Sequence, residues 1–289
     1  MNKVSINGRL YPADKAGIPI FDRAYLYGAG AFETLRAYNG TPAFVDLHHA
    51  RLRDNCAALQ IPFRSSLTAF RAQLLAVLRE NHARNVALRV TASQVGTTAI
   101  RRPRRGRSMI TIFLRPLPRR TSALYRRGAC VILVQDVHAD PPSIGTIKST
   151  SYLSKVLARN EVAAAHADEG LFMTSRDEIV EGTFTNLFVV HRGRVITPPL
   201  ATGVLPGVTR YLVLFLAQSL GLPVVEQRLH PADLRRADEL FLTGTTTEIL
   251  PIREVRGLVR RRPGPVTHQL MEAYQQLVQF QVQAKGSPG

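Results

Sequence analysis

The chain has little cysteine, and its two cysteines support neither a disulfide framework nor a structural zinc site. Cys56 and Cys130 stand far apart, outside any CxxC motif and away from histidines at metal-ligand spacing. No apolar run approaches the roughly 18 residues that would span a membrane. The opening MNKVSINGRL also lacks the apolar core of a secretory signal. We therefore expect a cytoplasmic protein with no bound metal and no membrane segment.

Acidic side chains are scarce relative to basic ones. The 289 residues include 38 Lys and Arg but 21 Asp and Glu, which gives a formal net charge of +17. A strongly basic chain can bind partners rich in phosphate, but most of these arginines are scattered. The one dense run, at residues 101–107, is interpreted first as a solvated hairpin tip. Two alternatives stay open: a lid that offers Arg to an anionic substrate, and a nucleic-acid-binding surface.

Length and composition indicate a globular protein with two domains. The chain is 45% hydrophobic and 20% charged. Pro116 and Pro118, followed by a polar stretch, interrupt the periodicity of the sequence. We predict a small N-terminal α/β domain at 1–119, an interdomain linker at 120–128 and a larger domain at 129–289.

Local patterns predict several elements of the first domain. The Asn39-Gly40 pair after AFETLRAY indicates a β-hairpin. Asp46 is expected to cap a helix on which Arg51 lies off the apolar stripe. A second helix is predicted around 67–78, and two strands flank the basic run.

In the second domain, an apolar strand at ACVILVQD precedes the sequence IKSTSYL. Ser149, Thr150 or Ser151 is expected to cap a helix that runs to about His166. Lys148 would then lie just before the helix, where the positive end of the helix dipole helps a lysine remain a neutral amine. A strand at FTNLFVV is expected to pair with one at RVITPP.

Five ordered motifs resemble those of the class IV (fold type IV) pyridoxal 5'-phosphate (PLP) enzymes. They are Arg51, IKSTSYL at Lys148, EGTFTNLF at Glu181, LPGVTR at Gly207, and LTGTTTEILP. The family includes branched-chain and D-amino acid aminotransferases and aminodeoxychorismate lyase. The resemblance covers nearly the whole chain, from about Ile20 to GPVTHQL. It implies an α/β (α+β) fold with a small N-terminal lobe and a larger lobe with a β-barrel-like core, PLP as cofactor, and a homodimer.

The resemblance also implies roles that agree with PLP chemistry. Lys148 would form the internal aldimine and move the proton at the substrate's Cα. Glu181 would keep the pyridine nitrogen protonated, and Arg51 would bind the cofactor's phosphate. Gly207 would allow close backbone approach, and the amides at the start of the next helix would face the anion. The other cofactor-binding residues implied are Tyr152, Leu205, Val208, Thr209, Thr245 and Thr246.

Substrate recognition is the part for which the sequence gives least guidance. Several D-amino acid and lyase relatives carry Arg before Gly where this chain has Gln94-Val95-Gly96, so the usual carboxylate clamp is in doubt. Another arginine would have to replace it. The candidate substrate-binding residues are Tyr27, Thr34, Arg36, Arg89 and Arg101.

Three functions remain in view. The Thr-Gly-Thr form in LTGTTTEILP favours an aminotransferase that acts between a branched-chain or glutamate-type amino acid and a 2-oxo acid. Thr34, in FETLR, is compatible with an aminodeoxychorismate lyase of the folate pathway, which forms 4-aminobenzoate and pyruvate. A basic nucleic-acid-binding protein that kept the fold but lost catalysis is the third alternative, and the intact Lys148, Glu181 and Arg51 argue against it.

Overall fold

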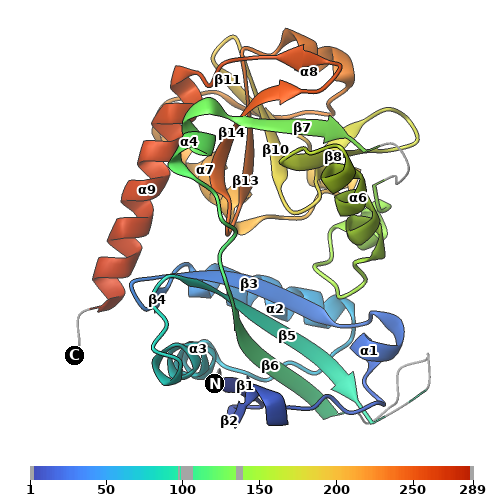
Figure 1. Cartoon of the computed structure of the whole chain (residues 1–289), viewed down its shortest axis with the longest axis vertical. Coiled ribbons are helices and arrows are strands. Elements are labelled where there is room, and N and C mark those ends of the chain that lie inside the picture. The colour runs from blue at the N-terminus through green and yellow to red at the C-terminus, as the bar shows by residue number, and fades with distance from the viewer. Residues whose placement is uncertain (1–2, 97, 99–106, 135–138, 287–289) are drawn as a thin grey trace. The chain divides into compact units, whose positions relative to one another are not determined.

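The computed structural model describes residues 3–96, 98, 107–134 and 139–286, and the chain divides into two compact units (Figure 1). The first unit comprises Met1–Pro118, Ile147–Tyr152 and Val278–Gly289, and the second comprises Arg119–Thr146 and Leu153–Leu277. The predicted boundary near residue 120 lies beside this division. The segment 147–152, predicted in the second domain, groups with the first unit because its backbone pairs with a strand of that unit.

The predicted linker at 120–128 is not an irregular connection. It contains helix α4 (Ser122–Arg127), and the Thr121 side chain accepts a hydrogen bond from the Leu124 backbone N–H at 3.2 Å. A threonine at this N-cap position satisfies one of the free amides of the first turn, which is why a helix begins here.

The first unit is a six-stranded antiparallel sheet with strand order β2-β1-β6-β5-β3-β4. Its strands are β1 (Lys3–Ile6), β2 (Arg9–Pro12), β3 (Ala31–Tyr38), β4 (Thr41–Pro42), β5 (Val86–Val95) and β6 (Arg107–Arg115). Its helices are η1 (Ala13–Lys15), α1 (Arg23–Tyr27), α2 (Val45–Ala58) and α3 (Leu67–Glu80). The predicted hairpin is confirmed, since Asn39 and Gly40 both have positive φ between β3 and β4. The predicted helix around 67–78 is confirmed as α3.

The two faces of β3 differ in their surroundings. Ala31, Leu35 and Ala37 are buried in a core with apolar residues of α2 and α3. Thr34 and Arg36 lie on the opposite face and are half-buried. The sheet therefore has one face covered by helices and one face that carries polar side chains.

Glu33 is a charged exception on the helix-covered face. Its carboxylate accepts hydrogen bonds from Nε and Nη2 of Arg51, both at 2.7 Å, and lies 2.7 Å from Nδ1 of His48. Burial alone would raise the pKa of Glu33, but the adjacent Arg51 and His48 outweigh it and lower this pKa to about 2. Burial lowers the pKa of His48, so a neutral imidazole faces the carboxylate.

Two predicted helix starts were wrong. Helix α2 begins at Val45, one residue before the expected cap Asp46, because Phe44 in a left-handed conformation serves as N-cap and both apolar side chains are buried. Asp46 instead lies in the first turn, where it faces the helix dipole. Helix α6 (Leu153–Ala164) begins after residues 149–151, because extended backbone pairing occupies them. Lys148 therefore does not lie directly before the helix, and the predicted effect of the helix dipole on its amine no longer applies.

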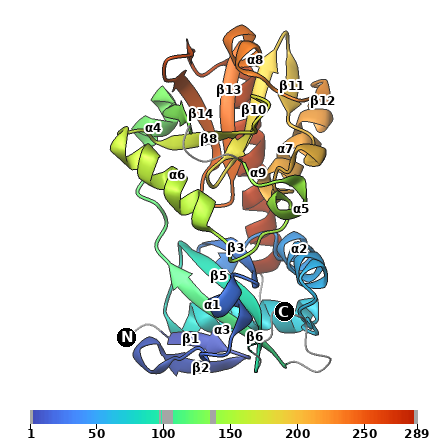
Figure 2. The same ribbon diagram turned by 90° about the vertical axis from the view of Figure 1, so that its right-hand side faces the viewer.

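The second unit contains a closed ring of six strands. Figures 1 and 2 show four of them, β8, β10, β13 and β14, from two directions. Strands β10, β13, β14, β7, β8 and β9 follow one another, and the additional pairing of β9 with β10 closes the ring. The expected β-barrel-like core is thereby confirmed. The strands of this unit are β7 (Ala129–Leu133), β8 (Glu169–Met173), β9 (Ile179–Gly182), β10 (Asn186–His191), β11 (Arg194–Thr197), β12 (Val224–Glu226), β13 (Glu239–Gly244), β14 (Glu248–Val255) and β15 (Val259–Arg260).

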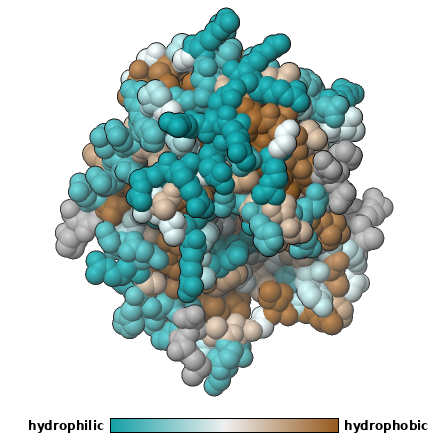
Figure 3. Space-filling view, turned by 45° about the horizontal axis from the view of Figure 1, so that its top comes forward, coloured by the Kyte–Doolittle hydropathy of each residue, from teal (hydrophilic) through white to brown (hydrophobic). Residues whose placement is uncertain are grey.

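Apolar residues of these strands fill the ring, among them Leu171, Leu187, Leu242 and Ile252. The further helices are α5 (Pro142–Gly145), η2 (Leu200–Thr202), α7 (Val208–Ser219), α8 (Pro231–Arg236) and α9 (Pro265–Gly286). Helix α6 packs on β8, and α7 packs on β13. None of the helices within the described ranges is both long and apolar enough to cross a membrane. Figure 3 shows a face on which hydrophilic side chains predominate, with apolar patches between them.

We expect the unfolding free energy to decrease as the pH falls from 7. Below the usual pKa of His48, 6.5, the unfolded state takes up a proton that the folded state resists. Below the usual pKa of Glu33, 4.5, the unfolded state takes up another, whereas folded Glu33 stays ionised to about pH 2. The stability present at pH 7 is therefore lost progressively as acid is added. Urea unfolding followed by circular dichroism from pH 7 to pH 3.5 measures this.

Glu33→Gln tests the source of this dependence. It leaves Arg51 facing an uncharged partner, so the unfolding free energy at pH 7 should drop by about 3 kcal/mol or more, and the dependence below pH 4.5 should flatten. Glu80→Gln breaks the exposed pair with Lys3 and should change the unfolding free energy far less, because solvent screens this pair. A pH profile of Glu33→Gln identical to that of the wild type would contradict the assignment.

Candidate functional site

Lys148 lies in an extended segment that pairs with the start of β3. Its carbonyl accepts a hydrogen bond from the Phe32 N–H at 2.9 Å, and Ser149 forms an antiparallel bridge with Ala31. The Thr150 N–H donates to the Gly30 carbonyl at 2.7 Å. These backbone bonds fix the position of Lys148 on the sheet without any helix.

The aromatic ring of Phe32 gathers three of the predicted site residues. Nζ of Lys148 lies 4.6 Å from the ring centroid, and the Arg89 guanidinium carbon lies 3.1 Å from it. The Tyr152 ring packs edge-on against Phe32, with centroids 5.1 Å apart. Phe32 is itself buried. The structure thus brings Lys148, Tyr152 and Arg89 together around one side chain.

The other predicted substrate residues of the first unit lie on or near the same sheet. Thr34 is the direct cross-strand partner of Arg89, so both lie on the face of Phe32. Arg36 follows on that face, with its guanidinium 4.4 Å from the Tyr38 ring centroid. Tyr27, in α1, donates its hydroxyl proton to the Thr98 carbonyl. Arg101 lies outside the described residues, as do the others of the predicted basic loop up to residue 106.

Arg89 has an unusual environment for an arginine. Burial, together with the positive charge of Arg115, lowers its pKa to about 10, although Tyr152 and Glu33 act in the opposite direction. It remains a cation at neutral pH. A largely buried guanidinium on the polar face of the sheet is suited to bind a carboxylate.

In the segment Gln94-Val95-Gly96, which raised doubt about the carboxylate clamp, Gln94 is buried and accepts a hydrogen bond from Nη1 of Arg23 at 3.1 Å. Arg51, the predicted phosphate ligand, uses two of its five N–H groups on Glu33. The bidentate carboxylate fixes the guanidinium plane, as an oriented phosphate-binding arginine requires.

In the second unit, Glu181 near the end of β9 is held by three donors. Its Oε2 accepts hydrogen bonds from the Leu205 N–H at 2.9 Å and from Nδ2 of Asn186 at 3.4 Å. Its Oε1 lies 3.1 Å from Nζ of Lys155. These three contacts hold the carboxylate in a fixed orientation, with two donors on Oε2 and one on Oε1.

The loop before α7 is tied to the same strands. The Leu205 carbonyl accepts a hydrogen bond from Nδ2 of Asn186 at 2.9 Å. A Cβ at position 207 would lie 2.1 Å from Oδ1 of Asn186, so this close approach requires Gly207. Gly207 is the N-cap of α7, and no side chain caps this end. The first-turn amides of Val208 and Thr209 are suited to face an anion.

Thr245 and Thr246 lie in the turn between β13 and β14, and both are half-buried. The Thr247 N–H donates to the Gly244 carbonyl at 3.1 Å, and the hydroxyl of Tyr125 donates to the Thr247 carbonyl at 2.9 Å. These bonds hold the turn in a fixed shape. The predicted site residues thus form one set in the first unit and another in the second.

The sequence did not identify Phe32, Asn186 and Lys155 as site residues. Asn186 is part of EGTFTNLF, and a buried asparagine at a strand start is a signal that it holds backbone groups. Phe32 resembles an ordinary core residue of a strand. Lys155 resembles an ordinary surface residue of a helix, and nothing local indicates its partner.

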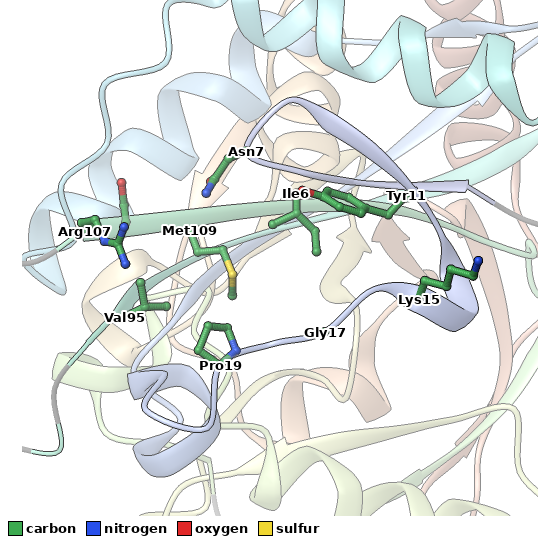
Figure 4. Close-up of a pocket in the computed structure, with 10 residues that line it drawn as sticks. Ile6, Asn7, Tyr11, Lys15, Gly17, Pro19, Val95, Arg107 and Met109 are labelled. Carbon is green, nitrogen blue, oxygen red and sulfur yellow. The ribbon is translucent and has the colours of Figure 1, made fainter.

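A cavity of about 350 Å³ in the first unit lies apart from these residues. Figure 4 shows that β1, β2, the loop after η1 and the two long strands β5 and β6 line it. A second cavity, of about 590 Å³, lies in the second unit beside Glu161 and Arg256. Neither is lined by a predicted site residue, so neither supports a catalytic role.

Comparison with known proteins identifies the class to which this fold and these residue sets belong. The closed six-stranded ring and the small antiparallel domain are those of a fold type IV PLP enzyme. Residues 30–255 match the family described as amino-transferase class IV, and the chain belongs to this family. It is a PLP-dependent enzyme.

Two relatives illustrate the range of the family. A Methanocaldococcus jannaschii protein provisionally named branched-chain-amino-acid aminotransferase is 33% identical over 95% of this chain and 96% of its own. The aminodeoxychorismate lyase of Bacillus subtilis is 29% identical over 98% of this chain and 97% of its own. Among solved structures, the T.th. branched-chain amino acid aminotransferase complexed with N-(5'-phosphopyridoxyl)-L-glutamate is 25% identical. It has a TM-score of 0.87 and covers 96% of this chain and 94% of its own.

We expect Gly207→Ala to weaken PLP binding by about tenfold or more, equivalent to about 1.4 kcal/mol. The new Cβ would overlap Oδ1 of Asn186 and push the loop away from its position. Titration of the apoenzyme with PLP, followed by absorbance, gives the dissociation constant. Gly17→Ala is the matched control, because no atom lies within 4 Å of its Cβ position. Equal affinities of the two variants for PLP would contradict the assignment of the loop at Gly207 to PLP binding.

Proposed function

We propose that the protein is an aminotransferase that moves an amino group between an amino acid and a 2-oxo acid, with Lys148 as its catalytic lysine. The observation that carries this proposal is the position of Lys148 beside Phe32 and Arg89 on the polar face of the sheet. It supplies an amine and a carboxylate-binding cation in one place. A homodimer and a location in the cytoplasm remain predictions.

Each predicted residue has a defined task in this proposal. Lys148 would hold the cofactor covalently until the substrate's amine displaces it, and the freed amine would then take the proton from the substrate's Cα and return it to the cofactor's carbon. Glu181 accepts a hydrogen bond from the pyridine nitrogen, and Tyr152 donates to the ring hydroxyl. PLP, when bound, supplies an electron-withdrawing ring that stabilises negative charge at Cα.

The phosphate is assigned to Arg51 and to backbone amides. Arg51 is oriented by Glu33, and the uncapped first turn of α7, at Val208 and Thr209, supplies N–H groups. The hydroxyls of Thr245 and Thr246 are assigned as additional donors, and Leu205 as the residue against the ring face. The buried support of Glu181 and the glycine at 207 fit a flat, phosphorylated pyridine.

We propose a branched-chain or glutamate-type amino donor. The 33% identical relative carries a branched-chain aminotransferase name, and the T.th. enzyme of that name was solved with a phosphopyridoxyl-glutamate adduct. Arg89 offers a half-buried cation for a substrate carboxylate. These observations favour amino transfer.

The aminodeoxychorismate lyase alternative is supported by one contact of its own. Thr34 lies directly across from Arg89, so a hydroxyl and a guanidinium share the face that carries Phe32. A hydroxyl there could assist the elimination that releases pyruvate, and the 29% identical lyase covers nearly the full chain. Activity therefore has to be tested for both reactions.

The first test follows the cofactor's absorbance while L- and D-amino acids are added one at a time. For an aminotransferase we expect one class of donor to remove the band and a 2-oxo acid to restore it. Lys148→Ala should slow this half-reaction by roughly 10³-fold. Release of 4-aminobenzoate and pyruvate from aminodeoxychorismate, without a response to amino acids, would replace the proposal by the lyase.

Borohydride reduction and peptide mapping provide a check that does not depend on activity. We expect the phosphopyridoxyl mass on the peptide that contains Lys148. Lys155, seven residues further along the chain, should stay unmodified. Modification of Lys155 instead would overturn the assignment.

Arg89→Met tests the carboxylate assignment. We expect kcat/KM for glutamate to fall at least about tenfold, mainly through KM, because a charged pair is lost. The value for a branched-chain donor should change less, since its side chain carries no charge. Arg64→Met, at an exposed position of the first unit, removes an equal charge and should leave both values near wild type. Equal losses with both donors would argue against side-chain recognition by Arg89.

A further inference from the structure

Helix α6 presents two cations to two buried carboxylates of the second unit. Lys155 and Arg159 are four residues apart, so both side chains leave the same face of the helix. Lys155 pairs with Glu181 at 3.1 Å, and Arg159 pairs with Glu169 at 3.3 Å. Glu181 has a proposed task at the cofactor, whereas Glu169 has none. The Arg159–Glu169 pair can therefore serve as a control for the Lys155–Glu181 pair.

The ammonium of Lys155 is largely shielded from water. The side chains of Lys155 and Glu181 are 18% and 8% exposed. Nζ of Lys155 also lies 5.2 Å from the ring centroid of the buried Phe172. An ammonium that contacts both a buried carboxylate and an aromatic ring acts through a lower effective dielectric than a surface charge would.

The three donors around Glu181 differ in kind. The Leu205 N–H and the Asn186 amide are neutral, and both bind Oε2. They orient the carboxylate but leave its charge uncompensated. Lys155 binds Oε1 and adds a full positive charge. Because the two neutral donors already orient the carboxylate, the main effect of Lys155 is on the electrostatic potential at Glu181.

We propose that Lys155 acts through Glu181 and sets how firmly this carboxylate holds the proton on the pyridine nitrogen of bound PLP. The inference rests on the proposed role of Glu181. A cation 3.1 Å from the carboxylate lowers the negative potential that a neighbouring protonated nitrogen feels. Lys155 thereby weakens the attraction for this proton. The Lys155–Glu181 pair thereby adjusts how strongly the cofactor ring withdraws electrons, because this strength depends on the proton at the ring nitrogen.

Other charged groups on the adjacent strands are already paired. Glu169 on β8 bonds with Arg159, and Glu178 just before β9 bonds with Arg228 at 2.5 Å. Removal of Arg159 therefore changes the charge next to Glu169. Removal of Lys155 changes the charge next to Glu181.

The test reads the protonation of the ring nitrogen directly. Holoenzyme is reconstituted with PLP that carries ¹⁵N in its pyridine ring, and the ¹⁵N chemical shift is followed with pH. In Lys155→Met we expect the midpoint of deprotonation to rise by about 1, as for loss of a neighbouring like charge. The shift at a fixed pH gives the protonated fraction where no full titration is reached. Lys155→Arg should stay near wild type.

Arg159→Met is the control, since it removes a cation of the same helix face. An unchanged or lower midpoint in Lys155→Met, or an equal rise in Arg159→Met, would overturn the inference. Lys155→Gln serves as a second variant if Lys155→Met loses PLP or does not fold.

Glu181→Gln separates the inference from the proposed function. If this variant keeps the wild-type midpoint, the role assigned to Glu181 itself fails. If Glu181→Gln lowers the midpoint but Lys155→Met leaves it in place, the role of Lys155 alone fails.

Discussion

The pairing of β9 with β10 is the constraint on which the second unit depends. The bridge between Glu181 and Asn186 closes the six-stranded ring and places these two side chains next to each other. Asn186 then binds both the Glu181 carboxylate and the Leu205 carbonyl, and Leu205 donates its own N–H to Glu181. One strand pairing therefore organises the barrel, the carboxylate and the loop that begins α7. Without it, the buried polar groups would lack partners at a cost of about 1–3 kcal/mol each.

A second pairing has the same importance in the first unit. The extended segment around Lys148 is bonded to the start of β3, whose alternating side chains separate two environments. Phe32 faces Lys148 and Arg89, whereas Glu33, the next residue, faces Arg51 and His48 on the helix-covered side. A single strand thus supports the lysine with one residue and the predicted phosphate-binding arginine with the next.

The scaffold is common to the whole family, whereas the choice of substrate depends on individual side chains. The backbone pairings and glycines that fit a phosphorylated pyridine are shared by enzymes with different reactions. Specificity depends on side chains such as Thr34 and Arg89, which lie on the polar face of β3 and β5. The segment Gln94-Val95-Gly96 lacks the arginine that several relatives carry there, and our proposal assigns the substrate carboxylate to Arg89 instead.

The sequence by itself determined the family, because the order of its motifs is a property of the chain alone. The hairpin at Asn39-Gly40 and helix α3 followed from turn chemistry and spacing alone. Only the tertiary structure decided the start of α6, since strand pairing across more than a hundred residues keeps the Lys148 segment extended. Tertiary structure also decided that Glu33 binds Arg51 and that Lys155 binds Glu181. Such partners are far apart in the chain, and a buried charge finds its counter-charge through packing rather than through sequence spacing.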